Sequence, residues 1–248
     1  MIKMSSVVDQ EHWDKGYKNL AFKYNEDNIL FKDIFYKYLK PNGTCFEVGC
    51  YPGGYLIYLG KNFNYCVSGI DKTPLTKERL PFYMKSENVS VGHFFNEDFL
   101  SFNPSEKYDV VFSFGFIEHF KDLDAIIEKH INLVKPTGIL IIACPNFTRG
   151  QYLFHRLFDS QNLDHHVIDT MNLCRWREIL KRNDMDILYD GYYETIKFWT
   201  ECSQKNIISQ NILNILLKTS HKINQHFHIP NRWFSPWMIS VSKKNNDV

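Results

Sequence analysis

The sequence lacks several features that would place it in a specialised class of protein. Its six cysteines form no Cys-x-x-Cys pair, so neither a zinc ribbon nor a redox-active dithiol is indicated. Its longest apolar runs, such as residues 139–144, are far shorter than the roughly 20 residues that cross a bilayer. Its 29 basic and 28 acidic residues leave a formal net charge of +1, so we expect no nucleic-acid partner and no membrane span.

The cysteines that are present favour a reducing compartment. Cys45, Cys66 and Cys144 lie in apolar, strand-like runs, where buried and reduced thiols are common. We therefore expect neither disulfides nor a metal site. The first six residues contain no apolar segment typical of a signal peptide, and we expect a cytoplasmic protein.

The sequence contains enough apolar residues to form the core of one large domain. Of its 248 residues, 44% are hydrophobic and 16% aromatic, a composition that excludes intrinsic disorder. We find no internal repeat and no low-complexity linker. We expect a single domain over residues 1–248. Its parts are an N-terminal helical cap (1–40), a central core (41–146) and a C-terminal region (147–248) with a helical insertion (198–234).

The central core alternates short apolar runs with helical patterns. The runs are almost continuously apolar, which favours a mostly parallel sheet covered by helices on both faces. Right-handed crossovers then make this a doubly wound, Rossmann-like α/β fold. The predicted strands are residues 44–49, 65–71, 89–95, 108–115 and 139–144, and the predicted helices are residues 53–61, 76–86 and 117–134.

The flanking parts give weaker patterns. Residues 10–40 are predicted to be helical, with Trp13, Tyr17 and Leu20 on one face and Leu30, Ile34 and Tyr38 on another. A turn is predicted at residues 136–138. Residues 147–169 follow no regular period, and a helix (171–183) and two strands (187–193 and 237–242) come after them.

The insertion contains an amphipathic helix at residues 207–223. Its apolar stripe consists of Ile208, Ile212, Ile215, Leu216 and Thr219. Such a helix is compatible with a pocket cover, the face of a homodimer or a membrane-surface helix. Basic residues are few, which makes the membrane the least supported of the three. The simplest expectation is burial of the stripe on its own domain.

The strongest local signal is a glycine-rich turn at residues 47–54. It follows a predicted strand and opens a helix, where glycines let a ligand approach the backbone and helix N–H groups are unpaired. Acids also lie at the ends of three successive strands: Glu47, Asp71 and Asp98. An acid after the second strand of such a fold can bind ribose hydroxyls. The pattern indicates a nucleoside site across the carboxyl ends of the sheet.

On these residues, the chain resembles the class I S-adenosylmethionine-dependent methyltransferases, of the small-molecule type found in bacterial glycan and quinone pathways. The matching motifs lie in the family's order, at residues 47–53, 69–71, 96–99, 108–113, 116–120 and 133–138. The resemblance implies a seven-stranded sheet with an antiparallel last strand, and S-adenosylmethionine as cofactor. The chain departs from the family at Tyr51, where a glycine is usual.

The resemblance also implies the cofactor-binding residues. Glu47 and Gly49 would hold the methionine end, Asp71 the ribose, and Asp98 with Phe99 the adenine. An alternative for Asp98 is that it caps a helix beginning at Phe99. The full expected set is Glu47, Gly49, Cys50, Gly53, Asp71, Lys72, Asp98, Phe99 and Ser113.

Two histidines are candidates for the catalytic base. His119 follows Glu118 at the start of the helix predicted after the fourth strand. His166 lies in the irregular segment, where members of the family place acceptor-binding parts. Each can accept a proton at neutral pH, and each can equally be a packing or surface histidine. Adjacent histidines such as His165 and His166 usually point apart, so we expect no metal shared between them.

Three further residues are expected near the acceptor. Trp13 and Tyr17 share a face of the leading helix, which in the family often covers the cofactor, although core packing explains them equally well. Asn146 directly follows the fifth predicted strand.

Other functions fit the sequence less well. A nicotinamide dehydrogenase needs G-x-G-x-x-G, which the spacing after Gly49 does not match. The turn is similar to that of ribosomal-RNA 2′-O-methyltransferases, but their acid after the fourth strand is replaced by Ser113-Phe114-Gly115. A non-catalytic methyltransferase-like binding module stays open, although the retained acids argue against it.

We therefore expect an S-adenosylmethionine-dependent methyltransferase with a small-molecule acceptor. The expected acceptor atom is an oxygen of a sugar or glycan precursor, and the alternative is a quinone or an amine. Because the sulfonium already activates the methyl group, the protein mainly has to orient the acceptor, which can supply roughly 7–11 kcal/mol.

Overall fold

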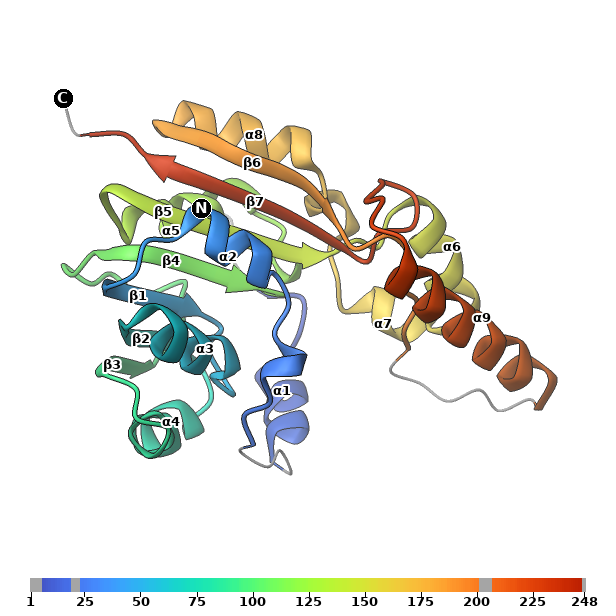
Figure 1. The fold of residues 1–248 in the computed structure, drawn as a ribbon, viewed down its shortest axis with the longest axis horizontal. Helices are drawn as coiled ribbons and strands as arrows, with labels where there is room; N and C mark the ends of the chain where they lie inside the picture. The colour runs from blue at the N-terminus through green and yellow to red at the C-terminus, as the bar shows by residue number, and fades with distance from the viewer. Residues whose placement is uncertain (1–5, 19–22, 201–206, 247–248) are drawn as a thin grey trace.

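The computed structural model describes residues 6–18, 23–200 and 207–246, which contain a seven-stranded sheet in the order β3-β2-β1-β4-β5-β7-β6 (Figure 1). Neighbours from β3 to β5 are parallel, and β7 is antiparallel to both β5 and β6. The predicted Rossmann-like sheet with its antiparallel last strand is confirmed. The strands are β1 (Gly43–Val48), β2 (Tyr65–Asp71), β3 (Val91–Asn96), β4 (Tyr108–Phe114), β5 (Val134–Pro145), β6 (Met185–Tyr193) and β7 (Trp237–Lys244).

Side chains that alternate along β1 build a core on each face of the sheet. Cys45 packs on one face with Phe35 and Leu56, and Phe46 packs on the other with Ile126 and Trp176. Helices α2 and α3 therefore cover one face, and α5 and α8 cover the other (Figure 1). The described helices are α1 (Gln10–Tyr17), α2 (Lys32–Tyr38), α3 (Gly54–Phe63), α4 (Leu75–Ser86), α5 (Leu123–Asn132), α6 (Arg149–Phe158), α7 (Ser160–Asp164), α8 (Leu173–Arg182) and α9 (Ile207–His226).

The strand order reverses at β1, which pairs with β2 on one side and with β4 on the other. Glu47 lies opposite Gly69 in the first pair and opposite Phe112 in the second. The connections leaving β1 and β4 run in opposite directions, so a crevice opens beyond the carboxyl ends of these strands.

The N-terminal cap differs from the continuous helical pattern predicted for residues 10–40. Between α1 and α2 the described residues contain a short 3₁₀ turn, Glu26–Asn28, in which the Asn25 side chain accepts the Asp27 N–H. Phe31 then adopts a left-handed conformation (φ 61°), so α2 starts afresh at Lys32. Leu30 precedes that helix, and Leu20 lies outside the described residues.

Three further predictions differ from the structure. The helix expected over residues 117–134 is divided into a 3₁₀ turn (Ile117–His119) and α5, because Asp122 caps the N-terminus of α5 by accepting the Ala125 N–H. The turn expected at residues 136–138 is an irregularity inside β5, where Thr137 has a φ of 62°. The segment 147–169, expected to be irregular, contains α6 and α7.

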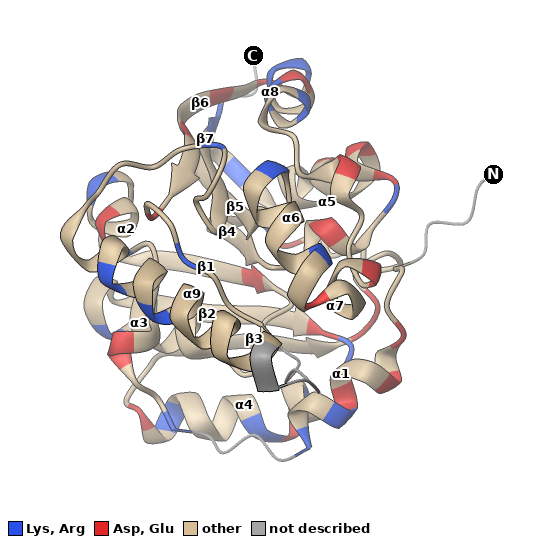
Figure 2. Cartoon of the chain, turned by 90° about the vertical axis from the view of Figure 1, so that its right-hand side faces the viewer, with Lys and Arg blue, Asp and Glu red and all other residues tan. Residues whose placement is uncertain are grey.

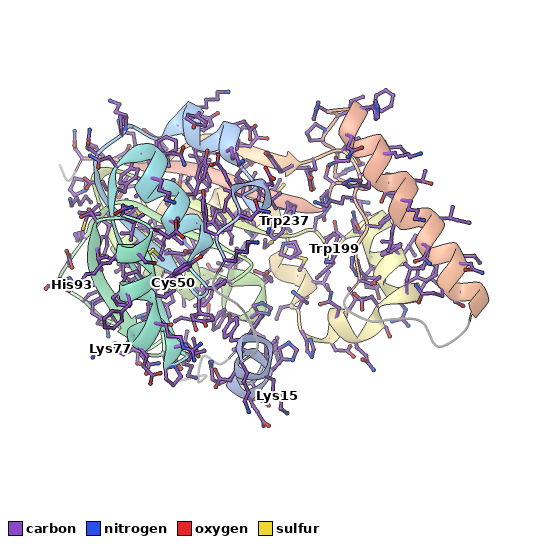
Figure 3. All side chains as sticks on the ribbon, turned by 60° about the horizontal axis from the view of Figure 1, so that its bottom comes forward. Lys15, Cys50, Lys77, His93, Trp199 and Trp237 are labelled. Carbon is purple, nitrogen blue, oxygen red and sulfur yellow. The ribbon has the colours of Figure 1, made fainter. Side chains whose placement is uncertain are left out.

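The insertion forms the predicted helix, α9, but the part of its predicted stripe that the structure describes, residues 212–219, is not buried, and the side chain of Ile208 lies outside the described residues. Ile212 and Ile215 are 48% and 64% exposed, whereas Leu213 and Ser220 are buried. The Ser220 hydroxyl accepts the Phe198 N–H, so the opposite side of the helix faces the segment that precedes it. In Figure 3, Trp199 lies between α9 and the sheet.

Charged residues form no large patch of one sign on the described helices (Figure 2). Basic and acidic residues are interspersed over the helices in Figure 2. Within the described ranges, no helix combines the length and apolar character that a bilayer span requires.

Candidate cofactor and acceptor site

A cavity of about 520 Å³ opens at the carboxyl ends of β1, β2 and β4. Gly49, Asp71 and Gly115 line it from the strand ends, and Trp13 and Tyr17 line it from α1. Its volume lies within the usual range for small-molecule sites, roughly 300–1,000 Å³. The cavity therefore occupies the predicted crevice, with α1 across it.

The glycine-rich turn is held against β2 by backbone hydrogen bonds. The N–H groups of Gly49 and Cys50 both donate to the carbonyl of Ile70, at 2.9 and 3.1 Å. Gly49 has a φ of 74°, and a Cβ on it would lie 2.9 Å from the ring of Phe116. A residue with a side chain would strain this turn, so glycine is required where the backbone meets the cavity.

Asp71 is positioned at the cavity by the same turn. Its carboxylate accepts the N–H of Tyr51 at 3.3 Å and the N–H of Thr73 at 3.1 Å. Burial raises the pKa of Asp71 to about 6, and these backbone hydrogen bonds limit the rise. The carboxylate is thus oriented and ionised at neutral pH, as a partner for ribose hydroxyls must be.

Glu47 lies in β1, two residues before Gly49, and is not itself among the residues that line the cavity. It is 5% exposed, and within the described part of the chain its Oε2 has no hydrogen-bond partner. Burial, with Asp71 nearby, raises the pKa of this carboxyl well above its ordinary value. A buried acceptor without a donor is costly, so the position suits the ammonium group of a bound ligand. This orphaned atom fits the methionine end of the predicted cofactor.

The residues predicted for the adenine lie at the next strand end. Asp98 and Phe99 line the cavity together with Lys72, whose Nζ lies 3.0 Å from Asp98 Oδ2. The other oxygen of Asp98 accepts the Leu100 N–H at 3.0 Å. Residues 99–101 form a turn and no helix begins at Phe99, so the alternative role of Asp98 as a helix cap is wrong. Phe99 packs edge-on against Phe116, which gives the cavity an aromatic wall.

Six of the predicted residues are not among those that line the cavity: Glu47, Cys50, Gly53, Ser113, Asn146 and His166. Cys50 and Ser113 are buried, at 1% and 0% exposure, and Gly53 packs against Met84. The Asn146 side chain is also buried: its amide nitrogen donates to the Ser235 carbonyl and its oxygen accepts from Thr148. The geometry gives Asn146 a structural task, to join the end of β5 to the segment before β7.

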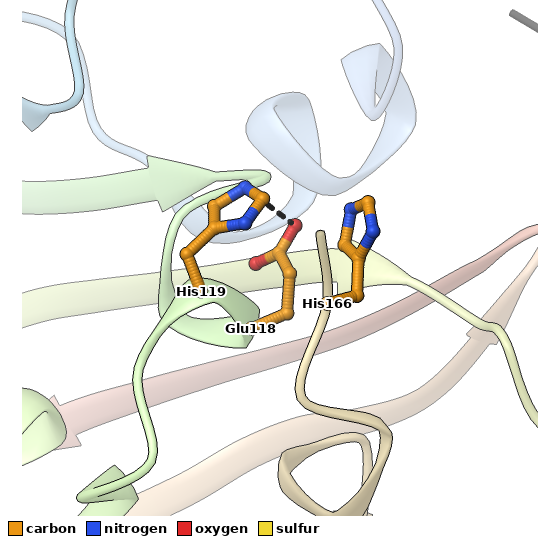
Figure 4. Close-up of side chains that lie close together, drawn as sticks. All are labelled: Glu118, His119 and His166. Carbon is orange, nitrogen blue, oxygen red and sulfur yellow. Dashed lines mark ion pairs between the residues drawn. The ribbon is translucent and has the colours of Figure 1, made fainter. Parts of the chain in front are cut away.

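The two predicted catalytic histidines lie close together (Figure 4). His119 lines the cavity, and its ring centroid is 4.9 Å from that of His166. Glu118 lies beside them, with Oε1 4.0 Å from His119 Nε2. His166 is not among the lining residues, and it reaches His119 from the segment after α7.

Both imidazoles are neutral at physiological pH. Burial is the main cause that lowers the pKa of His119 and of His166 to about 4. Burial acts in the opposite direction on Glu118, where it raises the pKa to about 8. Neither histidine is therefore a strong base in this environment.

Aromatic contacts join α1 to the rest of the site. Trp13 contacts the His119 ring, and Tyr17 contacts the Tyr51 ring with centroids 4.7 Å apart. Trp13 and Tyr17 thus lie at the cavity, where we expected them. Tyr51, Phe114 and Phe116 also line the cavity and were not predicted, although their places at or shortly after the ends of β1 and β4 could have indicated them.

Comparisons with known proteins agree on one class of fold and enzyme. The family described as "Methyltransferase domain" matches residues 17–189. A ubiquinone biosynthesis O-methyltransferase of Pelagibacter ubique is 25% identical over 163 residues, which cover 62% of this chain and 67% of the relative. A protein of the same name from Bartonella tribocorum is 22% identical over 80% of this chain and 69% of its own length.

Solved structures share the fold at low sequence identity. An S-adenosylmethionine-dependent methyltransferase from Geobacter sulfurreducens, in complex with S-adenosyl-L-homocysteine, superposes with a TM-score of 0.58 at 13% identity. That match covers 95% of this chain and 98% of the other. A putative methyltransferase from Haloferax volcanii, in complex with the activator Trm112, gives a TM-score of 0.64 at 15% identity, over 98% and 99% of the two chains.

Proposed function

The chain belongs to the methyltransferase domain family, and on this basis we propose that it methylates a ring hydroxyl of a small aromatic acceptor of the hydroquinone class. The family and its relatives make the protein an S-adenosylmethionine-dependent methyltransferase that acts on a small molecule. The acceptor is the new element of the proposal. The observation that carries it is one cavity that combines the oriented carboxylate of Asp71 with aromatic rings around His119.

The cofactor supplies a methyl group that its sulfonium already activates, and the residues of the cavity bind and orient it. The Asp71 carboxylate binds the ribose, and Glu47 accepts hydrogen bonds from the ammonium group. Gly49 lets the turn approach the ligand. Asp98 and Phe99 hold the adenine, on the predicted pattern. Trp13 and Tyr17 cover the cavity and exclude water from the reacting atoms.

An aromatic acceptor is supported by the rings that line the cavity. A planar ring stacks on or packs edge-on against aromatic side chains such as Trp13 and Phe116. Besides the two ubiquinone-pathway relatives, a 2-methyl-6-phytyl-1,4-hydroquinone methyltransferase of Synechocystis is 30% identical over 42% of this chain. A sugar hydroxyl, expected from the sequence, stays a prediction. An amine stays the alternative, because a pavine N-methyltransferase of Thalictrum flavum is 22% identical over 51% of the chain.

The acceptor hydroxyl has to lose its proton during the transfer. A phenolic hydroxyl has a pKa near 10, whereas the pKa of His119 and of His166 is lowered to about 4. Full transfer of a proton across about six pKa units costs about 8 kcal/mol. The predicted role of a histidine base is therefore open to direct test, and the site calls for a further means of stabilising the oxyanion.

An assay for release of S-adenosylhomocysteine tests the proposal. The purified protein is incubated with S-adenosylmethionine and one of three acceptor sets: substituted hydroquinols and catechols, nucleotide-linked sugars, or cyclic amines. We expect turnover with the ring hydroxyls and the methyl group on oxygen by mass spectrometry. Asp71→Ala serves as the cofactor-site control. Turnover with sugars or amines alone would overturn the assignment of the acceptor.

A further inference from the structure

Glu118, His119 and His166 form a compact group of side chains of metal-ligating types, of which His119 lines the cavity. Their ligand atoms all lie within 4.8 Å of one another (Figure 4). Glu118 and His119 come from the 3₁₀ turn after β4, and His166 comes from the segment after α7. The two segments are fixed to each other, because the Val167 N–H donates to the Glu118 carbonyl at 2.7 Å.

Backbone carbonyls orient both imidazoles from behind. The Nδ1 of His119 lies 2.8 Å from the His165 carbonyl, and the Nδ1 of His166 lies 2.7 Å from the Asn162 carbonyl. Since a carbonyl only accepts, each Nδ1 carries the hydrogen, and in a neutral ring the lone pair is then on Nε2. Histidines that ligate a metal through Nε2 are usually held in this way by their second nitrogen.

Glu118 gives an independent indication that this group binds a ligand. Its side chain is fully buried, and within the described residues neither carboxylate oxygen has a hydrogen-bond partner. A buried acid without donors is costly in either protonation state, and a cation beside it would satisfy both oxygens.

We propose that Glu118, His119 and His166 bind one divalent transition-metal ion, of which Zn²⁺ is the best match. Two imidazole nitrogens and one carboxylate oxygen are a common ligand set for catalytic zinc, which keeps a fourth position open. Mg²⁺ prefers an all-oxygen set. Ligand atoms around tetrahedral Zn²⁺ lie roughly 3.4 Å apart, so the three side chains need to close by about 1 Å or slightly more.

The open position would face the acceptor. Of the three residues, His119 lines the cavity, so an ion held on it borders the space that the acceptor occupies. A divalent ion lowers the pKa of a bound hydroxyl group, which would supply the stabilisation that two weakly basic imidazoles lack. This role rests on the proposed function, whereas binding of the ion does not.

Metal binding to the full-length protein tests the site directly. Chelator-treated, dialysed protein is titrated with Zn²⁺ by calorimetry and with Co²⁺ by visible absorption. We expect one ion per chain at micromolar or lower dissociation constant, and Co²⁺ bands typical of a site with nitrogen ligands. Glu118→Gln and His166→Ala should each weaken Zn²⁺ binding at least tenfold. His93→Gln is the matched control, because His93 is an exposed histidine beside a carboxylate, Glu106, at 3.1 Å.

Cofactor binding separates the outcomes. Each variant is first checked for binding of S-adenosylhomocysteine, which reports a folded protein. Zn²⁺ binding that is absent, or unchanged in both variants, would overturn the metal site. If ring hydroxyls are then still methylated by the chelator-treated protein, the proposed function stands without the metal. One ion bound, lost in both variants and retained in His93→Gln, supports the site whatever the acceptor proves to be.

Discussion

The indole ring of Trp13 lies against the imidazole ring of His119, with centroids 5.1 Å apart and planes inclined by 75°. This contact closes the cavity, because Trp13 belongs to α1 and His119 follows β4. None of the residues of α1 is buried, so the helix is held to the domain by contacts of this kind rather than by a core face. The two rings therefore link the covering helix to the reacting end of the site.

Trp13→Ala is expected to affect the acceptor more than the cofactor. Removing the ring opens the cavity beside His119 and deletes a surface on which a planar acceptor packs, an interaction worth roughly 0.5–1.5 kcal/mol beyond area burial. We expect KM for the acceptor to rise about tenfold, and the Kd of S-adenosylhomocysteine to change less. Trp233→Ala, at a partly exposed tryptophan outside the cavity lining, is the control. Equal effects of the two substitutions would remove Trp13 from the site.

The fold could be predicted further from the sequence than its connections could. Strands such as β2 and β4 are continuous apolar runs with clear ends, so periodicity places them within a residue. The predictions of helix starts were wrong where a single residue determines the boundary. The Asp122 cap begins α5 after a break that the apolar spacing from Ile117 conceals, and the left-handed Phe31 begins α2. Such choices depend on local hydrogen bonds and backbone conformation, which an apolar period does not report.

Asp71→Asn is expected to weaken cofactor binding. The substitution keeps the size of the side chain but removes the charge that strengthens hydrogen bonds from two hydroxyls. We expect the Kd of S-adenosylhomocysteine, measured by calorimetry, to rise by at least roughly tenfold, since hydrogen bonds to charged groups contribute about 1.5–3 kcal/mol. Asp186→Asn, on the far strand β6, is a matched control. Unchanged affinity in Asp71→Asn would place the ribose elsewhere.

Cofactor binding is expected to depend on pH through the same residue. Because burial raises the pKa of Asp71 to about 6, the carboxylate is ionised at pH 7.5 and mostly protonated at pH 5. Protonation removes an acceptor, so the affinity for S-adenosylhomocysteine should fall as the pH falls through 6. Calorimetry between pH 5 and 7.5 should find this fall in the wild type and a flatter profile in Asp71→Asn, which retains any contribution of Glu47. Parallel profiles would assign the titration to another group.

Gly49→Ala is expected to cost both stability and cofactor affinity. A left-handed conformation costs an L-residue roughly 1–2 kcal/mol, and the added Cβ would lie 2.9 Å from the Phe116 ring. We expect the free energy of unfolding in urea to fall by about 1–3 kcal/mol. Gly16→Ala is the control: it lies in α1 with no atom within 4 Å of the new Cβ, and should be neutral or stabilising by up to about 1 kcal/mol. A Gly49→Ala protein as stable as the wild type would contradict the strained turn.

The candidate site was predictable where the fold itself brings residues together. The ends of parallel strands meet at one edge, and Gly49, Asp71 and Asp98 accordingly line one cavity. Asn146 also follows a strand, but its amide is used in hydrogen bonds to Ser235 and Thr148, and nothing in the chain order indicates those partners. The meeting of His166 with Glu118 depends on the packing of α6 and α7, a region that the sequence pattern left irregular.

Glu118→Gln tests the unusual state of the buried carboxyl through folding stability. The pKa of Glu118 is raised from 4.5 to about 8 in the folded protein, so the folded state prefers the protonated form. The wild type therefore loses stability as the pH rises from about 4.5 to 8 and loses no more above that range. At 1.36 kcal/mol per pKa unit, the free energy of unfolding falls by about 4–5 kcal/mol over this pH range. A glutamine at this position does not ionise, so the variant has no such loss. We measure the free energy of unfolding in urea, with chelator present, from pH 5 to pH 8.5. Over this range the value for Glu118→Gln should rise by several kcal/mol relative to the value for the wild type.

Two comparisons decide whether this pH effect belongs to Glu118. Glu106→Gln, at a carboxylate on the surface beside His93, should follow the wild-type profile. Adding Zn²⁺ at pH 8.5 should restore stability to the wild type but not to Glu118→Gln, because an ion bound only to the folded state stabilises it by mass action. Profiles of wild type and Glu118→Gln that stay parallel from pH 5 to 8.5 would mean that the carboxyl is solvated or paired, and the reason for an ion at this position would then disappear.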